Sequence, residues 1–169
     1  MPLRESPHGG GGADAFLHVQ TKRAGKVKGE ATEPGHADDI RVVGWQWSLT
    51  AGSALGSKQA TGRRAYSALT VHKQIDSATT ALMAALSTND EVKEAKLTLR
   101  RAGGEQEDFF IVKLEQARIT SVQHSGEADG STHETVTIAF TKVEVEYRPQ
   151  KATGGRGGSH VFNDELVQN

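Results

Sequence analysis

Hydrophobic and polar residues alternate along most of the chain, with the period of two that is typical of β-strands. In the first such run, Leu17 and Val19 alternate with His18 and Gln20. The runs that predict strands in this way span residues 15–20, 66–73 and 95–100. Residues 161–167 predict a terminal strand or a docked peptide. The pattern therefore favours a mainly β protein.

Both tryptophans lie in one such run, which predicts a strand from Ile40 to about Thr50. In a continuous strand one face carries Val43, Trp45, Trp47 and Leu49, and the other carries Gly44, Gln46, Ser48 and Thr50. The aromatic face has three interpretations: a ligand platform, a core, or a seam with another chain. Because the opposite face is small and offers few polar groups to orient a ligand, we favour a core that extends toward a subunit seam.

A single segment has the period of a helix instead. From residue 77 to about residue 87 the apolar positions form one stripe, which consists of Ala78, Ala81, Leu82, Ala85 and Leu86. Asp76 or Ser77 is expected to cap the start of this helix. The chain thus predicts one α-helix among many strands.

Two strand segments change the parity of their apolar positions. In residues 108–122 the apolar positions are even up to Leu114 and odd from Ala117 onward, and residues 135–147 show the same change. Such a change indicates a bulge, a sharp bend, or burial on different faces at the two ends. Two changes in one small protein favour a coiled, closed sheet.

The regions without periodicity divide the chain. Residues 1–13 contain a glycine run and are expected to be a flexible leader, either native or left over from expression. Residues 14–151 form one domain, and its segment 51–65 is a long loop of the kind that is usually functional or disordered. Residues 152–169 form a Gly-rich tail that is too short for a fused toxin domain.

Composition narrows the possible functions. The 169 residues suffice for one domain, and 20 basic against 21 acidic residues give no overall attraction to nucleic acid. A hydrophobic content of 36% indicates a modest core that other subunits could complete. The chain has no cysteine, no apolar run long enough for membrane insertion, and no apolar segment of a secretory signal peptide.

No constellation of catalytic residues is recognisable, so we expect no enzymatic activity and no bound cofactor or metal. The seven histidines are scattered, and neither a Gly-x-Ser-x-Gly motif nor a phosphate-binding loop occurs. The densest ligand-like group is His36, Asp38 and Asp39. It could hold a cation, but a turn with side-chain hydrogen bonds is the simpler interpretation.

Opposite charges are sorted into separate loops. The loop 51–65 carries Lys58, Arg63 and Arg64 and no acid. The turn 103–108 carries Glu105, Glu107 and Asp108, and the loop 125–134 carries Glu127, Asp129 and Glu134. Ordinary solvated loops would look the same, but such sorting would also suit head-to-tail binding between copies. We hypothesise that the three cations meet an acidic loop of the next copy, which would make stacking sensitive to salt.

Several motifs occur together in one order: KGE, the GHADDI turn, the W-x-W strand, the K-x-I-D-x-x-T helix entry, the LRRAGG hairpin and the EYRPQ exit. Over residues 14–151 this order resembles the Hcp family, the tube-forming protein of bacterial type VI secretion. The resemblance implies a small β-barrel of two packed sheets with one flanking helix, at about residues 77–87. The chain differs from the family pattern in residues 1–13, which precede the usual start, and in a few extra residues at 20–24.

The resemblance also implies a function. Family members form hexameric rings that stack into an expelled tube, with sheath and spike proteins as partners and secreted effectors carried in the lumen. The loop 51–65, including Leu55, is expected to contact neighbouring or stacked rings. Ser77, Thr80 and Ser121 are candidate lumen residues by the same resemblance. No cofactor is implied.

Two alternatives remain at this level. One is a barrel like those of phage tail tubes that works outside type VI secretion, and the other is a carbohydrate-binding or hydrolytic β-barrel that uses the tryptophans. For a tube subunit we expect synthesis in the bacterial cytoplasm and secretion without a cleaved signal peptide.

Overall fold

The computed structural model describes residues 13–52, 63–102, 107–150 and 158–166. All of the predicted leader except Ala13, and half of the predicted Gly-rich tail, lie outside these residues. The described elements are β1 (Ala13–Thr21), β2 (Gly25–Lys26), β3 (Ile40–Val42), β4 (Gly44–Gln46), β5 (Leu49–Ala51), β6 (Arg64–Tyr66), β7 (Leu69–Lys73), α1 (Thr79–Ser87), β8 (Val92–Arg101), β9 (Asp108–Gly126), β10 (Thr132–Ala139), β11 (Lys142–Tyr147) and β12 (His160–Glu165). The prediction of a mainly β chain with one helix is confirmed.

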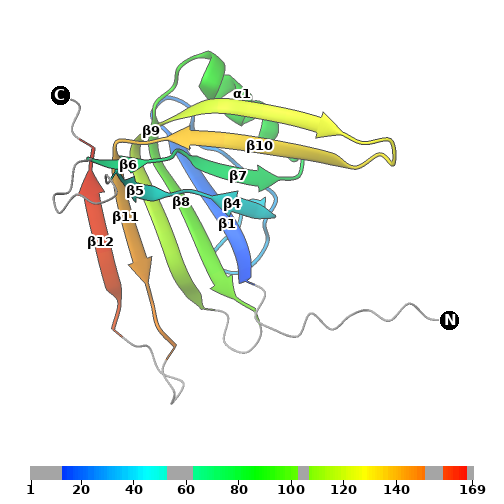
Figure 1. Cartoon of the computed structure of the whole chain (residues 1–169). Helices are drawn as coiled ribbons and strands as arrows, with labels where there is room; N and C mark the ends of the chain where they lie inside the picture. The colour runs from blue at the N-terminus through cyan, green and yellow to red at the C-terminus, as the bar shows by residue number, and fades with distance from the viewer. Residues whose placement is uncertain (1–12, 53–62, 103–106, 151–157, 167–169) are drawn as a thin grey trace.

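Ten of the strands form one long antiparallel sheet that bends into two packed layers (Figure 1). Its order is β2-β1-β8-β9-β10-β7-β4, with β3 beside β1 and with β11 and β12 continuing outward from β9. Strands β5 and β6 form a separate two-stranded sheet. No pairing among the described strands joins the two ends of the order, so the predicted barrel is an open one. The two packed sheets and the flanking helix match the prediction.

Strand β9 belongs to both layers, and Gln116 is the residue where it changes layer. Before this residue β9 pairs with β8 and β11, and from Arg118 onward it pairs with β10. Gln116 has a φ of 49°, and the register with β8 is the same on its two sides, where Glu94 pairs with Glu115 and Val92 with Ala117. Leu114 and Ala117 are both buried although their parity differs. The first predicted parity change is therefore a sharp bend without a shift of register.

The second parity change has a different cause, because residues 135–147 are not one strand. Residues 140 and 141 separate β10 from β11, and the chain passes from one layer to the other there. Ile138 is buried from the β10 side and Val143 from the β11 side. The apolar parity changes because two strands present their inner faces to the same core from opposite sides.

The tryptophan segment is the main correction to the prediction. It forms three short strands, β3, β4 and β5, in place of one. A bend at Val43 breaks the alternation, so Val42 is buried while Val43 is 66% exposed. Leu49 is also exposed, because β5 has left the main sheet. The predicted face of Val43, Trp45, Trp47 and Leu49 therefore does not exist as one surface.

Helix α1 covers one end of the core (Figure 1). It begins at Thr79, two residues later than predicted, because Asp76 forms a turn in which its Oδ1 accepts a hydrogen bond from the Ala78 amide at 2.9 Å. Ala78, Leu82 and Ala85 are buried as expected, whereas Ala81 and Leu86 are exposed. Among the described residues, no helix is both long and apolar enough to cross a membrane.

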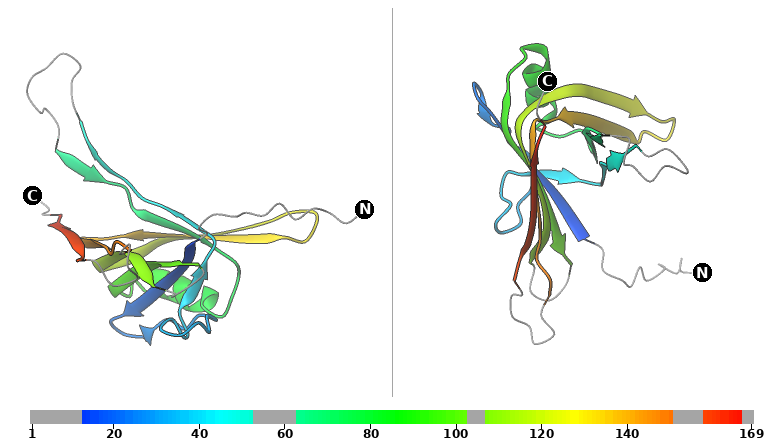
Figure 2. Two further views of the ribbon diagram at one scale, coloured as in Figure 1. Left: turned by 90° about the horizontal axis from the view of Figure 1, so that it is seen from below. Right: turned by 60° about the vertical axis from the view of Figure 1, so that its left-hand side comes forward.

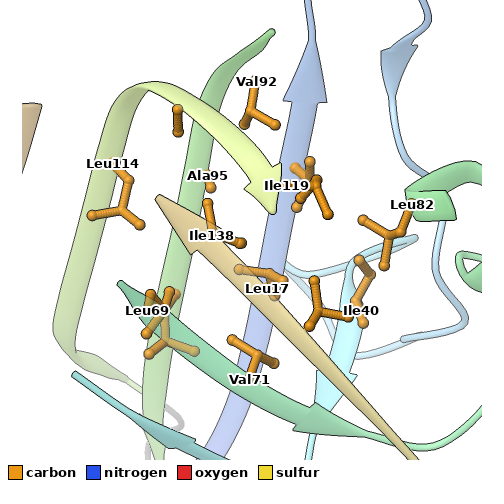
Figure 3. Packing of buried hydrophobic residues seen from close by; sticks show 14 of the residues in the cluster. Leu17, Ile40, Leu69, Val71, Leu82, Val92, Ala95, Leu114, Ile119 and Ile138 are labelled. Carbon is orange, nitrogen blue, oxygen red and sulfur yellow. The ribbon is translucent and has the colours of Figure 1, made fainter. Parts of the chain in front are cut away.

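The core lies between the two layers and is aliphatic. Figure 3 shows Leu17, Val71 and Ile138 meeting from three different strands, with Leu82 of α1 closing one side. All four side chains are essentially inaccessible to solvent. Burial of an aliphatic side chain of this size contributes about 1.5–3 kcal/mol, so this cluster is the main source of stability.

Candidate assembly surfaces

The predicted contact loop 51–65 begins and ends as strands. Leu49–Ala51 and Arg64–Tyr66 pair as an antiparallel ribbon, which we call the arm, and Figure 2 shows it extending away from the two layers. Trp47 stacks on Tyr66 at 6.0 Å between ring centroids, and both rings lie edge-on to Phe140. An aromatic cluster therefore fixes the base of the arm.

The C-terminal strand holds the arm from the other side. Arg64 forms an ion pair with Asp164 of β12, in which Nη2 donates to Oδ1 at 3.0 Å, and the Tyr66 hydroxyl donates to the same carboxylate at 2.7 Å. Hydrogen bonds from Arg64 and Tyr66 lower the pKa of Asp164. The sequence offered no signal for this contact, because 100 residues separate Arg64 from Asp164.

The other predicted contact residues of this loop have different positions. Leu55 and Lys58 lie outside the described residues. Arg63 is exposed beside the arm. Arg64 has its partner within the chain, so the structure places it at the arm and not at a free loop.

In the first predicted acidic loop, Asp108 has hydrogen-bond partners within the chain. Glu105 lies outside the described residues. The Glu107 carbonyl accepts the Arg101 amide at 2.9 Å. The Asp108 carboxylate accepts hydrogen bonds from His36 at 3.0 Å and from Arg100 at 3.1 Å. Asp108 is therefore a structural residue of this fold.

The second acidic loop closes the hairpin of β9 and β10. Residues 125–133 form a protruding tip, which we call the acidic finger, and Figures 1 and 2 show it extending beyond the other strands. Asp129 accepts hydrogen bonds from the Ser131 amide at 2.9 Å and hydroxyl at 2.6 Å, which lower its pKa. The Glu127 side chain is 67% exposed, and its nearest described partner is His133 at 4.0 Å.

The group around His36 forms a network of charged hydrogen bonds. The Nδ1 atom of His36 lies 2.9 Å from a carboxylate oxygen of Asp39, and its Nε2 atom lies 3.0 Å from one of Asp108. The His36 ring stacks on Phe16 with 4.3 Å between the ring centroids. Burial raises the pKa of Asp39, but hydrogen bonds from His18, His36 and Lys26 outweigh it and hold the pKa at about 2. Both ring nitrogens of His36 face carboxylates, and this supports the interpretation as a turn.

The same turn explains why the KGE and GHADDI motifs occur together. The amide of Gly29 donates to the Asp38 carbonyl at 2.8 Å, so the two segments run side by side. A Cβ at Gly29 would lie 2.3 Å from the Asp39 carbonyl oxygen, so any other residue would clash with the backbone there. Glu30 reaches the helix entry, where its carboxylate accepts the Ser77 amide at 2.9 Å.

The K-x-I-D-x-x-T motif builds a second buried network. Lys73 is paired with Glu134 and with Asp76, and the Thr79 hydroxyl donates to Glu134 at 2.7 Å. His124 also contacts the Glu134 carboxylate at 2.7 Å. These bonds lower the pKa of Glu134 against the opposing effect of its burial. The network attaches the start of α1 to the hairpin that carries the acidic finger.

The remaining predicted residues are spread over the fold. Ser77 and Thr80 are exposed at the start of α1, where the Ser77 hydroxyl donates to the Lys28 carbonyl at 3.2 Å. Ser121 is half-buried on β9, opposite Thr137. Trp45 is half-buried and stacks on Phe110 at 6.0 Å. Many of the described charged groups hold separate segments of the fold together.

Comparisons with known proteins agree with this architecture. A solved structure described as a type six secretion system protein superposes with a TM-score of 0.81 at 27% identity, covering 92% of this chain and 96% of that chain. The fold is therefore one found among type VI secretion proteins. The protein hcp1 of Pseudomonas aeruginosa is 36% identical over 152 residues, which are 88% of this chain and 91% of that protein.

The family assignment follows from these likenesses and from one more. Residues 16–147 match the family described as type VI secretion system effector, Hcp. The chain belongs to the Hcp family. The major exported protein of Pseudomonas aeruginosa is a further relative, 28% identical over 135 residues that make up 75% of this chain and 78% of that protein. The resemblance seen in the sequence motifs is thus confirmed.

Proposed function

We propose that this protein is a structural subunit that assembles into hexameric rings, that these rings stack into the inner tube of a type VI secretion system, and that effectors travel in the lumen. We infer further that it works without an active site and is exported from the cytoplasm without a cleaved signal peptide. Its other partners would be the sheath and spike proteins. Membership in the Hcp family supports the proposal.

The observation that carries the proposal is an uncovered edge of the sheet. Strand β12 pairs on one side with β11, and no described strand pairs with its other side. Val161 and Phe162 on this strand are 50% and 45% exposed, and Tyr147 on β11 is 42% exposed. An open edge with apolar side chains favours pairing with another chain, and soluble monomers usually protect such an edge.

A ring needs a heterologous contact, in which the open edge of one copy meets a different surface of the next. Such a contact of standard size would bury about 800 Å² on each partner. The acidic finger extends from another part of the fold, and the arm contacts β12 through Asp164 and Glu165, so each copy has distinct surfaces for this purpose.

Mass measurement combined with microscopy tests the proposal. Sedimentation of the full chain should give a species of six times the 18.1 kDa chain mass, and negative-stain images should show rings with a central hole. Replacing Val161 and Phe162 by Lys should abolish the rings while circular dichroism still reports a folded chain. The exposed Met83→Lys is the control, because it adds a charge on α1 away from the edge. A monomer at all concentrations would refute the proposal.

A further inference from the structure

A polar hollow of about 260 Å³ lies beside the His36 network. It is bordered by the turn at residues 35–39 and by the outer face of the strands next to it. The side chains that matter for its charge are His18, Lys26, Asp39, Lys96, Asp108 and Arg148. The hollow is large enough to admit one carboxylate-bearing side chain.

The acids of this hollow already have partners. Asp39 accepts hydrogen bonds from His36, His18 and Lys26, and Asp108 accepts them from His36 and Arg100. They therefore do not neutralise a further cation. What remains of the lining charge is positive.

Lys96 is the cation without compensation. It makes no hydrogen bond or ion pair with any residue that the structure describes. On β8 it lies directly opposite Lys113 of β9 on one side and His18 of β1 on the other. Like charges opposite each other on a sheet are unfavourable. Lys113 is paired with Glu115 at 3.1 Å and with Glu144 of the same row at 3.9 Å, whereas no described carboxylate forms an ion pair with Lys96.

The acidic finger supplies an exposed carboxylate whose negative charge is opposite to that of Lys96. Strand β7 ends at Lys73, which pairs with Glu134, so within the described fold β10 has only β9 beside it beyond that point. The tip is nevertheless well formed, because the Glu127 amide donates to the Ser131 carbonyl at 2.9 Å and Asp129 is tied to Ser131. Asp129 is thereby occupied, and Glu127 is left as the exposed carboxylate of a preformed turn.

We propose that the acidic finger of one copy docks into the hollow of a neighbouring copy, with the Glu127 carboxylate entering beside Lys96. The finger extends away from the rest of its own sheet, so the partner is a second copy. Each copy then both gives a finger and receives one, which is the heterologous contact that a closed ring requires. This inference rests on the proposed function and names one of its subunit contacts.

Charge reversal tests the contact and its direction. Lys96→Glu and Glu127→Lys should each lower the apparent association constant of ring formation by about tenfold or more, because each places like charges at the contact. Combining both changes in one chain should restore assembly, since the pair is then present with its signs exchanged. Lys93→Glu is the matched control, because Lys93 is an exposed lysine of the same strand outside the hollow.

Cysteine cross-linking tests proximity without relying on charge. The chain has no cysteine, so a Lys96→Cys, Glu127→Cys double variant introduces the only two thiols. Mild oxidation of its rings should give a ladder of disulfide-linked chains on a non-reducing gel, because a disulfide requires Cα atoms within roughly 7 Å of each other. The Lys93→Cys, Glu127→Cys variant should give no such ladder.

The possible outcomes separate the two proposals. If the unmodified chain forms rings, restored assembly in the exchanged variant and the ladder both support the docking. Rings that are unaffected by either single reversal, or a failure of the exchanged variant to recover, would overturn the docking and leave the ring proposal intact. An unmodified chain that forms no rings would overturn both.

Discussion

Asp39 is the residue on which the turn at 33–39 depends. Its carboxylate receives hydrogen bonds from two histidines and a lysine in a site that is only 7% exposed. An ionised carboxylate in such a place is stabilised by its donors and loses that stabilisation when it is protonated. The sequence motif around His36 pointed to a turn or a cation site, and the contacts of Asp39 show what the turn contributes.

We therefore expect the stability of the protein to fall in acid partly through Asp39. Its pKa is about 2 in the folded chain against an ordinary 3.8, so the contribution is present above about pH 4 and is lost as the pH falls toward 2. This difference corresponds to about 2 kcal/mol. Urea unfolding at pH 7 and at pH 3 should show that Asp39→Asn loses more stability at pH 7 than at pH 3.

Asp38→Asn is the control for this prediction. Asp38 is the exposed neighbour, and asparagine tolerates its φ of 64°. The control should unfold like the unmodified chain at both values of pH. Equal losses in both variants, or a loss in Asp39→Asn that does not depend on pH, would contradict the role assigned to the ionised carboxylate.

At the scale of elements, the bend at Gln116 in β9 decides how the sheet passes from one layer to the other. Gln116 occupies a left-handed backbone conformation, which costs a residue with a Cβ about 1–2 kcal/mol. The apolar positions on either side of it changed parity in the sequence, and for this reason a bulge or bend there was predictable. The residue at its centre was not, because glutamine gives no signal for that conformation.

Glycine at this position should therefore be favourable, contrary to its usual effect in strands. We expect Gln116→Gly to raise the free energy of unfolding by up to about 1 kcal/mol, and Gln116→Val to lower it by about 1–3 kcal/mol. Denaturant unfolding measures both. The control is Gln123→Gly, an exposed glutamine of the same strand paired in regular register with Thr135, which should lose about 0.5–1 kcal/mol. Parallel losses for both glycine variants would rule out backbone strain at Gln116.

At the scale of the whole molecule, the contacts that set its shape join distant parts of the chain. The arm is held by β12, and the helix entry is held by the acidic hairpin through the buried pair of Lys73 and Glu134. Alternation predicted the strands because it depends on near neighbours along the chain. It failed where the tertiary structure breaks a regular run, as at Val43, and it could not indicate that Asp164 faces Arg64.

The ion pair between Arg64 and Asp164, which we call the clasp, should limit the motion of the arm. We expect Asp164→Asn to speed hydrogen exchange of the amides at residues 64–66, because the ion pair and the acceptor of the Tyr66 hydroxyl are both weakened. Unfolding of the core should change little, since the clasp is exposed. Glu165→Gln is the control, because Glu165 offers its backbone carbonyl, and not its side chain, to Arg64. Unchanged exchange at 64–66 would contradict this role.

Strand β9 also determines how mechanical load passes between the two layers. It is one uninterrupted run of 19 residues that is shared by both layers. A load applied to one layer along this strand passes to the other through covalent backbone bonds. In a sandwich whose sheets share no strand, the same load would pass between the layers only through non-covalent side-chain packing. The bend at Gln116 thus joins the two layers through one continuous backbone.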